Sequence, residues 1–226
     1  MCKYVAVVPV RAGSRRLKNK NISKFGESNL LEHKINILKR VPFIDKIIVS
    51  SDSNLMLDMA CNLHVDTHKR PAEYCDELTK PFGSVVSHIC KNIEGENVIW
   101  SPVTAPLISV NTYNNSIDLY EKNVLNSDFD SLISVESFKR YLWRKQGPVN
   151  YKLGMAHVPS QDLEEMFFIT DGVIVAPREK MIDWSYFHGE NPFMMKINRE
   201  EAVDIDDQYD LNLANMLFEK YKKYMY

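Results

Sequence analysis

The sequence lacks the features of a membrane-spanning, exported or nucleic-acid-binding protein. No window holds about 18 consecutive apolar residues, the length that a membrane-spanning helix needs. The N-terminal apolar run, residues 4–10, contains Pro9 and is followed by Arg11 without a small-residue cleavage site, so we expect a buried strand and no signal peptide. The 28 Lys and Arg nearly balance the 30 Asp and Glu, which argues against a nucleic acid or an anionic membrane held by bulk charge.

Disulfide patterns and the common nucleotide-binding loops are missing as well. The four cysteines are scattered without close-pair spacing, and with no export signal we expect reduced thiols in a cytoplasmic protein. The chain has no G-x-x-x-x-G-K-[ST] P-loop, no G-x-G-x-x-G dinucleotide turn and no G-x-S-x-G elbow. Any phosphate-binding site in this chain must therefore be built differently.

Apolar runs alternate with helical patterns along the first 130 residues. Short Val- and Ile-rich runs predict buried strands, and apolar residues recur at helical spacing between them. Units of this kind pair in parallel through right-handed crossovers, so we predict a Rossmann-like α/β fold, an open and mostly parallel sheet with helices on both faces. The expected strands are residues 3–9, 46–51, 97–100 and 130–135, and the expected helices are residues 29–40, 54–63, 80–92 and 112–123.

The pattern breaks over residues 136–166, which are rich in Lys, Arg, Tyr, Gln and Pro. We expect an inserted hairpin or arm here, within a single domain that spans residues 1–226. Residues 166–177 then predict two short strands about Asp171-Gly172, and residues 202–206 predict another. A last helix is expected over residues 209–220. Its expected buried side is Leu211, Leu213, Ala214, Leu217 and Phe218.

A basic turn follows the first predicted strand and is the best candidate for a ligand site. Ligands of open α/β sheets bind at the carboxyl ends of the strands. Gly13 allows backbone N–H groups to approach a phosphate, and Ser14 adds a hydroxyl donor. The turn also carries five cations, which favours polyphosphate binding over the alternative of a solvated basic loop. These cations are Arg11, Arg15, Arg16, Lys18 and Lys20.

Two aspartates near the C-terminal end form a candidate metal site. In an extended segment Asp204 and Asp206 face the same side, and paired carboxylates suit Mg²⁺, which takes its other ligands from phosphate and water. The alternative is that Asp206 or Asp207 caps the last helix. Asp52, after the second strand, has the same two interpretations, a ligand contact or a helix cap.

Five motifs, in this order, resemble the CMP-sialic acid synthetases, the acylneuraminate cytidylyltransferases of the nucleotidyltransferase superfamily. They are VPVRAGSRRLKNKN, KIIVSSDS, KRPAEYCDELT, SPVTAPL and DIDDQYDLNLA, and together they cover nearly the whole chain. The resemblance implies transfer of CMP from CTP to a sialic acid-like nonulosonic acid with release of pyrophosphate, for surface glycan synthesis. It also implies Mg²⁺ as cofactor and a homodimer formed through the segment 136–166.

The resemblance also implies roles for individual residues. The turn that holds the CTP phosphates corresponds to Arg11, Gly13, Ser14, Arg15, Lys20 and Asn21, with Arg15 where Lys is common. Lys20, Arg11 and Asp206 are the implied catalytic residues. Arg70 and Thr79 match positions near the base and ribose, and Asp204 and Asp206 match the magnesium ligands. Asp171-Gly172 falls beside the acceptor, where the family often has Asn-Gly.

The chain departs from the family pattern on the acceptor side. Pro102 of SPVTAPL stands where a Gln is common, and proline has no side-chain hydrogen bond to offer. This departure leaves acceptors other than N-acetylneuraminic acid open, namely Kdo and a small phosphorylated or carboxylated metabolite. A non-catalytic nucleotide-binding relative is a further alternative. The inserted segment carries a basic cluster that either binds an acceptor anion or is plain surface. The cluster is Lys139, Arg140, Arg144 and Lys145.

Overall fold

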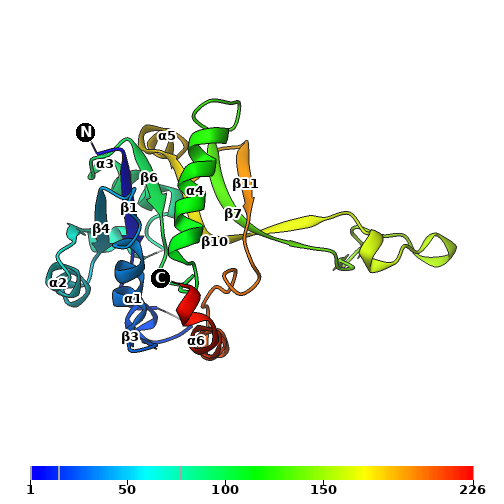
Figure 1. The fold of residues 1–226 in the computed structure, drawn as a ribbon, viewed down its shortest axis with the longest axis horizontal. Helices are drawn as coiled ribbons and strands as arrows, with labels where there is room; N and C mark the ends of the chain where they lie inside the picture. The colour runs from blue at the N-terminus through cyan, green and yellow to red at the C-terminus, as the bar shows by residue number, and fades with distance from the viewer. Residues whose placement is uncertain (1, 15, 77, 226) are drawn as a thin grey trace.

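A seven-stranded mixed sheet forms the centre of the protein. The structure, a computed structural model, describes residues 2–14, 16–76 and 78–225. The strand order is β11-β7-β10-β6-β1-β4-β5 (Figure 1). The strands are β1 (Tyr4–Pro9), β4 (Lys46–Ser51), β5 (Asp66–Lys69), β6 (Asn97–Trp100), β7 (Ser131–Phe138), β10 (Met166–Pro177) and β11 (Pro192–Lys196).

The prediction of a mostly parallel sheet is confirmed. β1 pairs in parallel with β4 and β6, β4 pairs in parallel with β5, and β11 pairs in parallel with β7. β10 is the exception, because it runs antiparallel to both β6 and β7. The carboxyl ends of β1, β4 and β6 consequently meet at one edge of the sheet.

Helices cover both faces of this sheet, as predicted. Successive residues of β1 alternate between the two layers: Ala6 and Val8 pack into one apolar cluster, and Val5 and Val7 into the other. The larger cluster includes residues of α1 (Leu30–Leu38), α2 (Asn54–Asn62), α4 (Val110–Asn123) and α6 (Gln208–Tyr221). The smaller includes residues of α3 (Phe82–Lys91) and α5 (Arg178–Trp184). None of the helices in the described part of the chain is long and apolar enough to cross a membrane.

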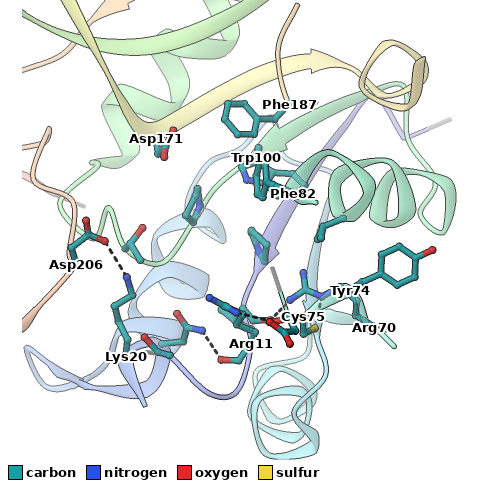
Figure 2. A pocket seen from close by; sticks show the side chains of 18 of the residues that line it. Arg11, Lys20, Arg70, Tyr74, Cys75, Phe82, Trp100, Asp171, Phe187 and Asp206 are labelled. Carbon is teal, nitrogen blue, oxygen red and sulfur yellow. Dashed lines mark hydrogen bonds and ion pairs between the residues drawn. The ribbon is translucent and has the colours of Figure 1, made fainter. Parts of the chain in front are cut away.

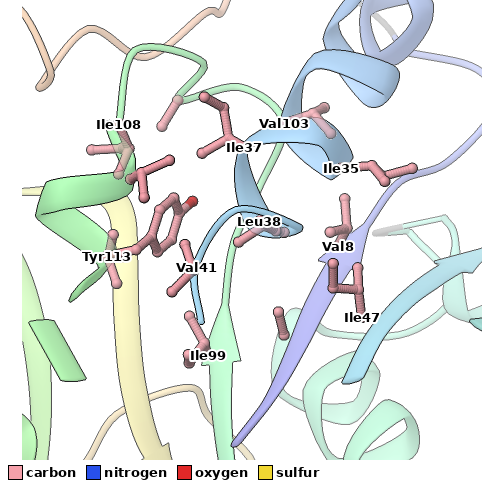
Figure 3. Packing of buried hydrophobic residues seen from close by; sticks show 14 of the residues in the cluster. Val8, Ile35, Ile37, Leu38, Val41, Ile47, Ile99, Val103, Ile108 and Tyr113 are labelled. Carbon is pink, nitrogen blue, oxygen red and sulfur yellow. The ribbon is translucent and has the colours of Figure 1, made fainter. Parts of the chain in front are cut away.

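The larger apolar cluster joins α1 to the sheet and to α4. Figure 3 shows Ile35 and Leu38 of α1 above Val8 of β1, with Tyr113 of α4 on the other side of the same cluster. All four side chains are at most 2% exposed. Helix α1 is therefore fixed against both the first strand and the segment that follows β6.

Polar caps set where the helices begin. Asn29 accepts a hydrogen bond from the backbone N–H of Glu32 at the start of α1, and Ser53 accepts one from Met56 at the start of α2. The cap of α2 is thus Ser53 and not Asp52. Asp52 instead accepts the backbone N–H of Ala12 at 2.9 Å, so it ties the basic turn to the end of β4.

Two strand predictions are wrong. Residues 166–177 form the single strand β10, whose register with β7 shifts between Ile169 and Ile174. Asp171 lies inside this irregularity with a left-handed backbone, φ 50°, and pairing on both sides lets the strand continue past it. Residues 203–206 belong to no strand. The backbone N–H of Ile205 donates to the carbonyl of Thr104 at 2.8 Å, and Ile205 is buried, whereas its two neighbours are partly exposed.

The segment between β7 and β10 projects from the body as a long arm (Figure 1). Its tip holds a short hairpin, β8 (Trp143–Arg144) and β9 (Gly147–Pro148), and a second short hairpin near the N-terminus pairs β2 (Lys24–Phe25) with β3 (Ser28–Asn29). Rings within the arm contact one another: Tyr141 lies 4.9 Å from Tyr151 and 5.0 Å from His157 between ring centroids.

Candidate functional site

A cavity of about 440 Å³ opens at the carboxyl ends of β1 and β6 (Figure 2). Its wall joins parts of the chain that are far apart in the sequence: the basic turn, the segment after β5, the start of α3, the end of β6 and the segment after it, β10, the segment after α5, and the acidic segment of residues 204–206. The lining residues include Arg11, Ser14, Arg16, Lys20, Asn21, Arg70, Tyr74, Cys75, Lys80, Phe82, Trp100, Pro102, Thr104, Asp171, Phe187, Asp204 and Asp206.

The basic turn is held in place by hydrogen bonds of Arg11 and Asn21. Arg11 donates from Nη1 to the carbonyl of Cys75 at 2.7 Å, and the buried Asn21 donates from Nδ2 to the carbonyl of Arg11 at 2.9 Å. Gly13 has φ 72°, a left-handed conformation in which glycine is unstrained. The turn can thus present cations and backbone donors at fixed positions.

The basic turn and the acidic segment meet across the cavity. Lys20 donates from Nζ to the carbonyl of Ile205 at 2.7 Å, and the same Nζ lies 3.5 Å from Oδ1 of Asp206. Arg16 forms a two-pronged ion pair with Asp206, with N–O distances of 2.7 and 2.5 Å. Residues almost 190 positions apart in the sequence therefore share one electrostatic site.

Asp204 is the most unusual carboxylate of the site. It is half-buried overall, and its Oδ1 is buried without a hydrogen-bond partner in the described part of the chain. Burial raises the pKa of Asp204; the Thr104 side chain opposes that rise, and the charge of Asp206 adds to it. Burial likewise raises the pKa of Asp171, which His188 opposes and Asp206 reinforces.

These carboxylates fit a divalent cation. A buried carboxylate oxygen without a partner is costly unless a cation or donor compensates it. The described residues contain no group of three or more His, Cys, Asp or Glu that could hold a metal ion alone. Asp204 and Asp206 therefore suit Mg²⁺, which binds through one or two carboxylates and completes its shell with phosphate and water.

Helix α6 is capped by Asp207 and by neither member of the acid pair, Asp204 and Asp206. Asp207 is the N-cap of α6 and accepts the backbone N–H groups of Tyr209 and Asp210. Asp210 returns a bond by accepting the N–H of Asp207, and it also accepts that of Asp206 at 2.9 Å. The carboxylate of Asp206 is consequently not used as a helix cap; it lines the cavity, where it pairs with Arg16 and Lys20.

The other predicted site residues are only partly brought together. Arg70 lines the cavity while 3% exposed; it donates to the carbonyl of Val10 at 2.7 Å and to Sγ of Cys75 at 2.9 Å. Thr79 contacts Asp76 at 3.3 Å. Among the described residues that line the cavity, neither Gly13 nor Thr79 appears. Arg15 lies outside the described residues.

An aromatic wall, Phe82, Trp100 and Phe187, closes one side of the cavity and was missed in the sequence. The ring of Phe82 lies 5.3 Å from that of Phe187 and 6.2 Å from that of Trp100. Pro102 lines the cavity as well, and Figure 2 shows Asp171 beside Phe187. The three rings come from α3, β6 and the segment after α5, so no local pattern unites them. The sequence also offers no indication that Arg16, one of several cations in the basic turn, pairs with Asp206.

Comparisons with known proteins identify the family of the chain. The sequence pattern of the cytidylyltransferase family matches residues 5–152. The chain is 21% identical over 226 residues to the pseudaminic acid cytidylyltransferase of Campylobacter jejuni, 96% of each chain. It is 19% identical over 228 residues to the N-acylneuraminate cytidylyltransferase of Streptococcus agalactiae, covering 97% of this chain and 54% of that relative.

A solved structure shows the same fold. The fold matches that of a CMP:2-keto-3-deoxy-manno-octonic acid synthetase complexed with CTP, with a TM-score of 0.70, 10% sequence identity, and coverage of 96% of this chain and 99% of that chain. The arrangement of strands and helices is thus one that is found in a protein crystallised with a cytidine nucleotide.

Proposed function

Because the chain belongs to the cytidylyltransferase family, we propose that it transfers CMP from CTP to an acidic sugar of the nonulosonic acid class and releases pyrophosphate. The observation that carries this proposal is the meeting of the basic turn and the acid pair in one cavity. Lys20 reaches both the backbone and the carboxylate of the acidic segment. A triphosphate with a bound divalent cation needs both kinds of group in one site, cations for the phosphates and carboxylates for the metal.

In the proposed reaction the acceptor hydroxyl attacks the α-phosphorus of CTP in line. A new O–P bond forms, the bond to the β-phosphate breaks, and pyrophosphate leaves with its electron pair. Arg11, Arg16 and Lys20 neutralise charge that builds on the phosphoryl oxygens, and catalysis consists of positioning and electrostatic stabilisation. Asp204 and Asp206 would hold Mg²⁺, which supplies further charge neutralisation at the phosphates when bound. We assign the hydroxyl proton to a carboxylate of this pair, with a metal-bound hydroxide as the alternative base.

On the nucleotide side, we assign the phosphates to the turn formed by Arg11, Gly13, Ser14, Lys20 and Asn21. Arg70 lies at the same wall as Tyr74 and Cys75, which supports a role near the base and ribose. Thr79 and Arg15 keep the nucleotide roles that the family resemblance implies, as proposals that mutation can test.

For the acceptor side, the aromatic wall and Pro102 favour a sugar with an apolar substituent. Acetamido methyl groups and deoxy carbons pack well on aromatic faces, whereas a chain of hydroxyls would lose its hydrogen bonds to water there. Relatives of the chain are named for pseudaminic acid and N-acylneuraminate. Pro102 offers no side-chain hydrogen bond, so the acceptor need not be the one that the usual Gln would bind. Kdo is the second candidate acceptor, because the CMP:2-keto-3-deoxy-manno-octonic acid synthetase has the same fold.

The arm supports a homodimer. It leaves large apolar side chains exposed, among them Trp143 at 60% and Leu153 at 63%, far from the central sheet (Figure 1). Such a surface is stabilised when a second copy covers it. The exposed basic cluster of Lys139, Arg140, Arg144 and Lys145 lies on the same arm, where an acceptor anion is one fitting partner.

A panel of acceptors with CTP, UTP and GTP in Mg²⁺, scored for pyrophosphate, tests the proposal. We expect pyrophosphate release with CTP and with at least one nonulosonic acid, and little with UTP or GTP. Release with Kdo alone would support the second acceptor. CTP binding by calorimetry with no pyrophosphate from any acceptor would identify a non-catalytic relative and refute the enzymatic proposal.

A further inference from the structure

One lysine lies wholly inside the protein, behind the candidate site. Lys34 on α1 is 0% exposed, and within the described part of the chain its Nζ forms no salt bridge. It donates to the carbonyl of Ala105 at 2.7 Å and to the hydroxyl of Tyr113 at 2.9 Å. Burial lowers the pKa of Lys34 to about 7, and the charge of Glu201 opposes that shift. A buried amine costs folding free energy that an aliphatic side chain would not.

The contacts of Lys34 converge on the segment after β6, residues 101–107. Ala105 belongs to this segment, and Tyr113 hydrogen-bonds through its hydroxyl to Ser101, the first residue of it. His33, the neighbour of Lys34, contacts the carbonyl of Pro106 through Nε2 at 2.8 Å. Both ends of the segment are therefore fastened to α1.

The same segment also contacts the acid pair, Asp204 and Asp206. The carbonyl of Thr104 accepts the backbone N–H of Ile205 at 2.8 Å, and this is the residue between Asp204 and Asp206. Ile205 is itself 0% exposed. Thr104 also lines the cavity and interacts with the Asp204 carboxylate. A displacement of residues 101–107 would move the two carboxylates with it.

We infer that Lys34 is a positioning residue for the acid pair: by fastening Ala105 and Tyr113 it fixes Thr104, which fixes Ile205 between the two aspartates. The inference depends on the proposed function only for the chemical use of that pair. The competing interpretation is a lysine that stabilises the core as a whole. The two differ in whether loss of Lys34 acts locally on residues 203–206 or on the entire fold.

Hydrogen exchange of Lys34→Met separates the two interpretations without any assay of activity. Met has a similar length and no donor. We expect the Ile205 amide to exchange at least about tenfold faster than in the wild type, while amides of β1 and β4 keep their protection. Lys39→Met, the same change at an exposed position just after α1, is the control and should leave Ile205 unchanged. Unchanged Ile205 protection, or an even loss across the sheet, would overturn the inference.

A second measurement uses the metal. In the presence of CTP, Lys34→Met should raise the half-saturating Mg²⁺ concentration about tenfold, as changes behind metal ligands commonly do, with KM for CTP at saturating Mg²⁺ within about twofold. Tyr113→Phe removes one oxygen and leaves the bond from Lys34 to Ala105, so its effect should be smaller and in the same direction. Should Lys34→Met fail to fold, Tyr113→Phe decides: normal Ile205 exchange in that variant would refute the inference. If no acceptor supports transfer, the exchange results still stand on their own.

Discussion

The two sides of the cavity are built by different physical means. On the proposed nucleotide side, polar side chains are fixed by directed bonds: Arg11 to Cys75, Asn21 to Arg11, and Lys20 to Ile205. On the proposed acceptor side, the aromatic wall and Pro102 line the cavity, and the surface that they offer is apolar and undirected. Directed bonds hold charges against one phosphate geometry, whereas an apolar wall tolerates changes of substituent.

The largest effect should come from the acid pair. Asp206→Ala removes the carboxylate that faces Arg16 and Lys20, and we expect kcat to fall by about 10³-fold at saturating Mg²⁺ in a protein that stays folded. The neighbouring Asp207→Ala is the matched control, because it removes a helix cap and should cost about 1 kcal/mol of unfolding free energy with little loss of turnover. Near wild-type turnover in Asp206→Ala would remove the metal role of this residue.

The second-largest effect should come from Lys20, on the proposed nucleotide side. Lys20 has a side chain only 14% exposed and contacts the acidic segment, whereas Lys18 is exposed. Lys20→Ala should lower kcat by about 10²-fold, and Lys18→Ala should change it less than about twofold. Steady-state kinetics with CTP measure both. Equal small losses of kcat in the two variants would mean that the turn is a solvated basic patch and binds no phosphate.

The sequence predicts the nucleotide side better than the acceptor side. The strand of residues 3–9 is apolar on both faces, so its position at the centre of the sheet and the basic turn at its end follow from pattern alone. Spacing also brings Asp204 and Asp206 to one side, although the strand expected for them does not form. Their extended path is set by the buried Ile205 and its bond to Thr104, a tertiary contact with no local signature.

The aromatic wall and Lys34 were beyond prediction for a related reason. Phe82, Trp100 and Phe187 are distributed over three elements, and only the packing of α3 and the segment after α5 against β6 brings them together. A lysine in a helical pattern is ordinarily solvated. The spacing of residues 29–40 places Lys34 on the same helical face as Leu31 and Ile35. It does not show that the amine stays buried, because a lysine at the margin of such a face ordinarily extends to solvent.

A smaller effect, confined to one substrate, should appear at the aromatic wall. Phe187→Ala removes apolar surface from the acceptor side, and we expect KM for the acceptor to rise about tenfold while KM for CTP stays within about twofold. Phe43→Ala, at an exposed phenylalanine outside the cavity lining, is the control. A rise in KM for CTP instead would place the nucleotide base at this wall and reverse the assignment of the two sides.

The smallest effect should be a change of stability with pH that depends on Lys34. Residues 101–107 carry Pro102 and Thr104, and Lys34 fastens them. The pKa of Lys34 is about 7 in the folded protein against an ordinary 10.5, so between these values the unfolded chain binds more protons and stability rises with pH. The unfolding free energy of the wild type, relative to Lys34→Met, should therefore rise by about 1 kcal/mol per pH unit from pH 7.5 to 9.5 and level off below pH 7. Urea denaturation at each pH measures this difference, with Lys39→Met as the flat reference, and a difference that does not change with pH would mean that Lys34 keeps its charge at high pH.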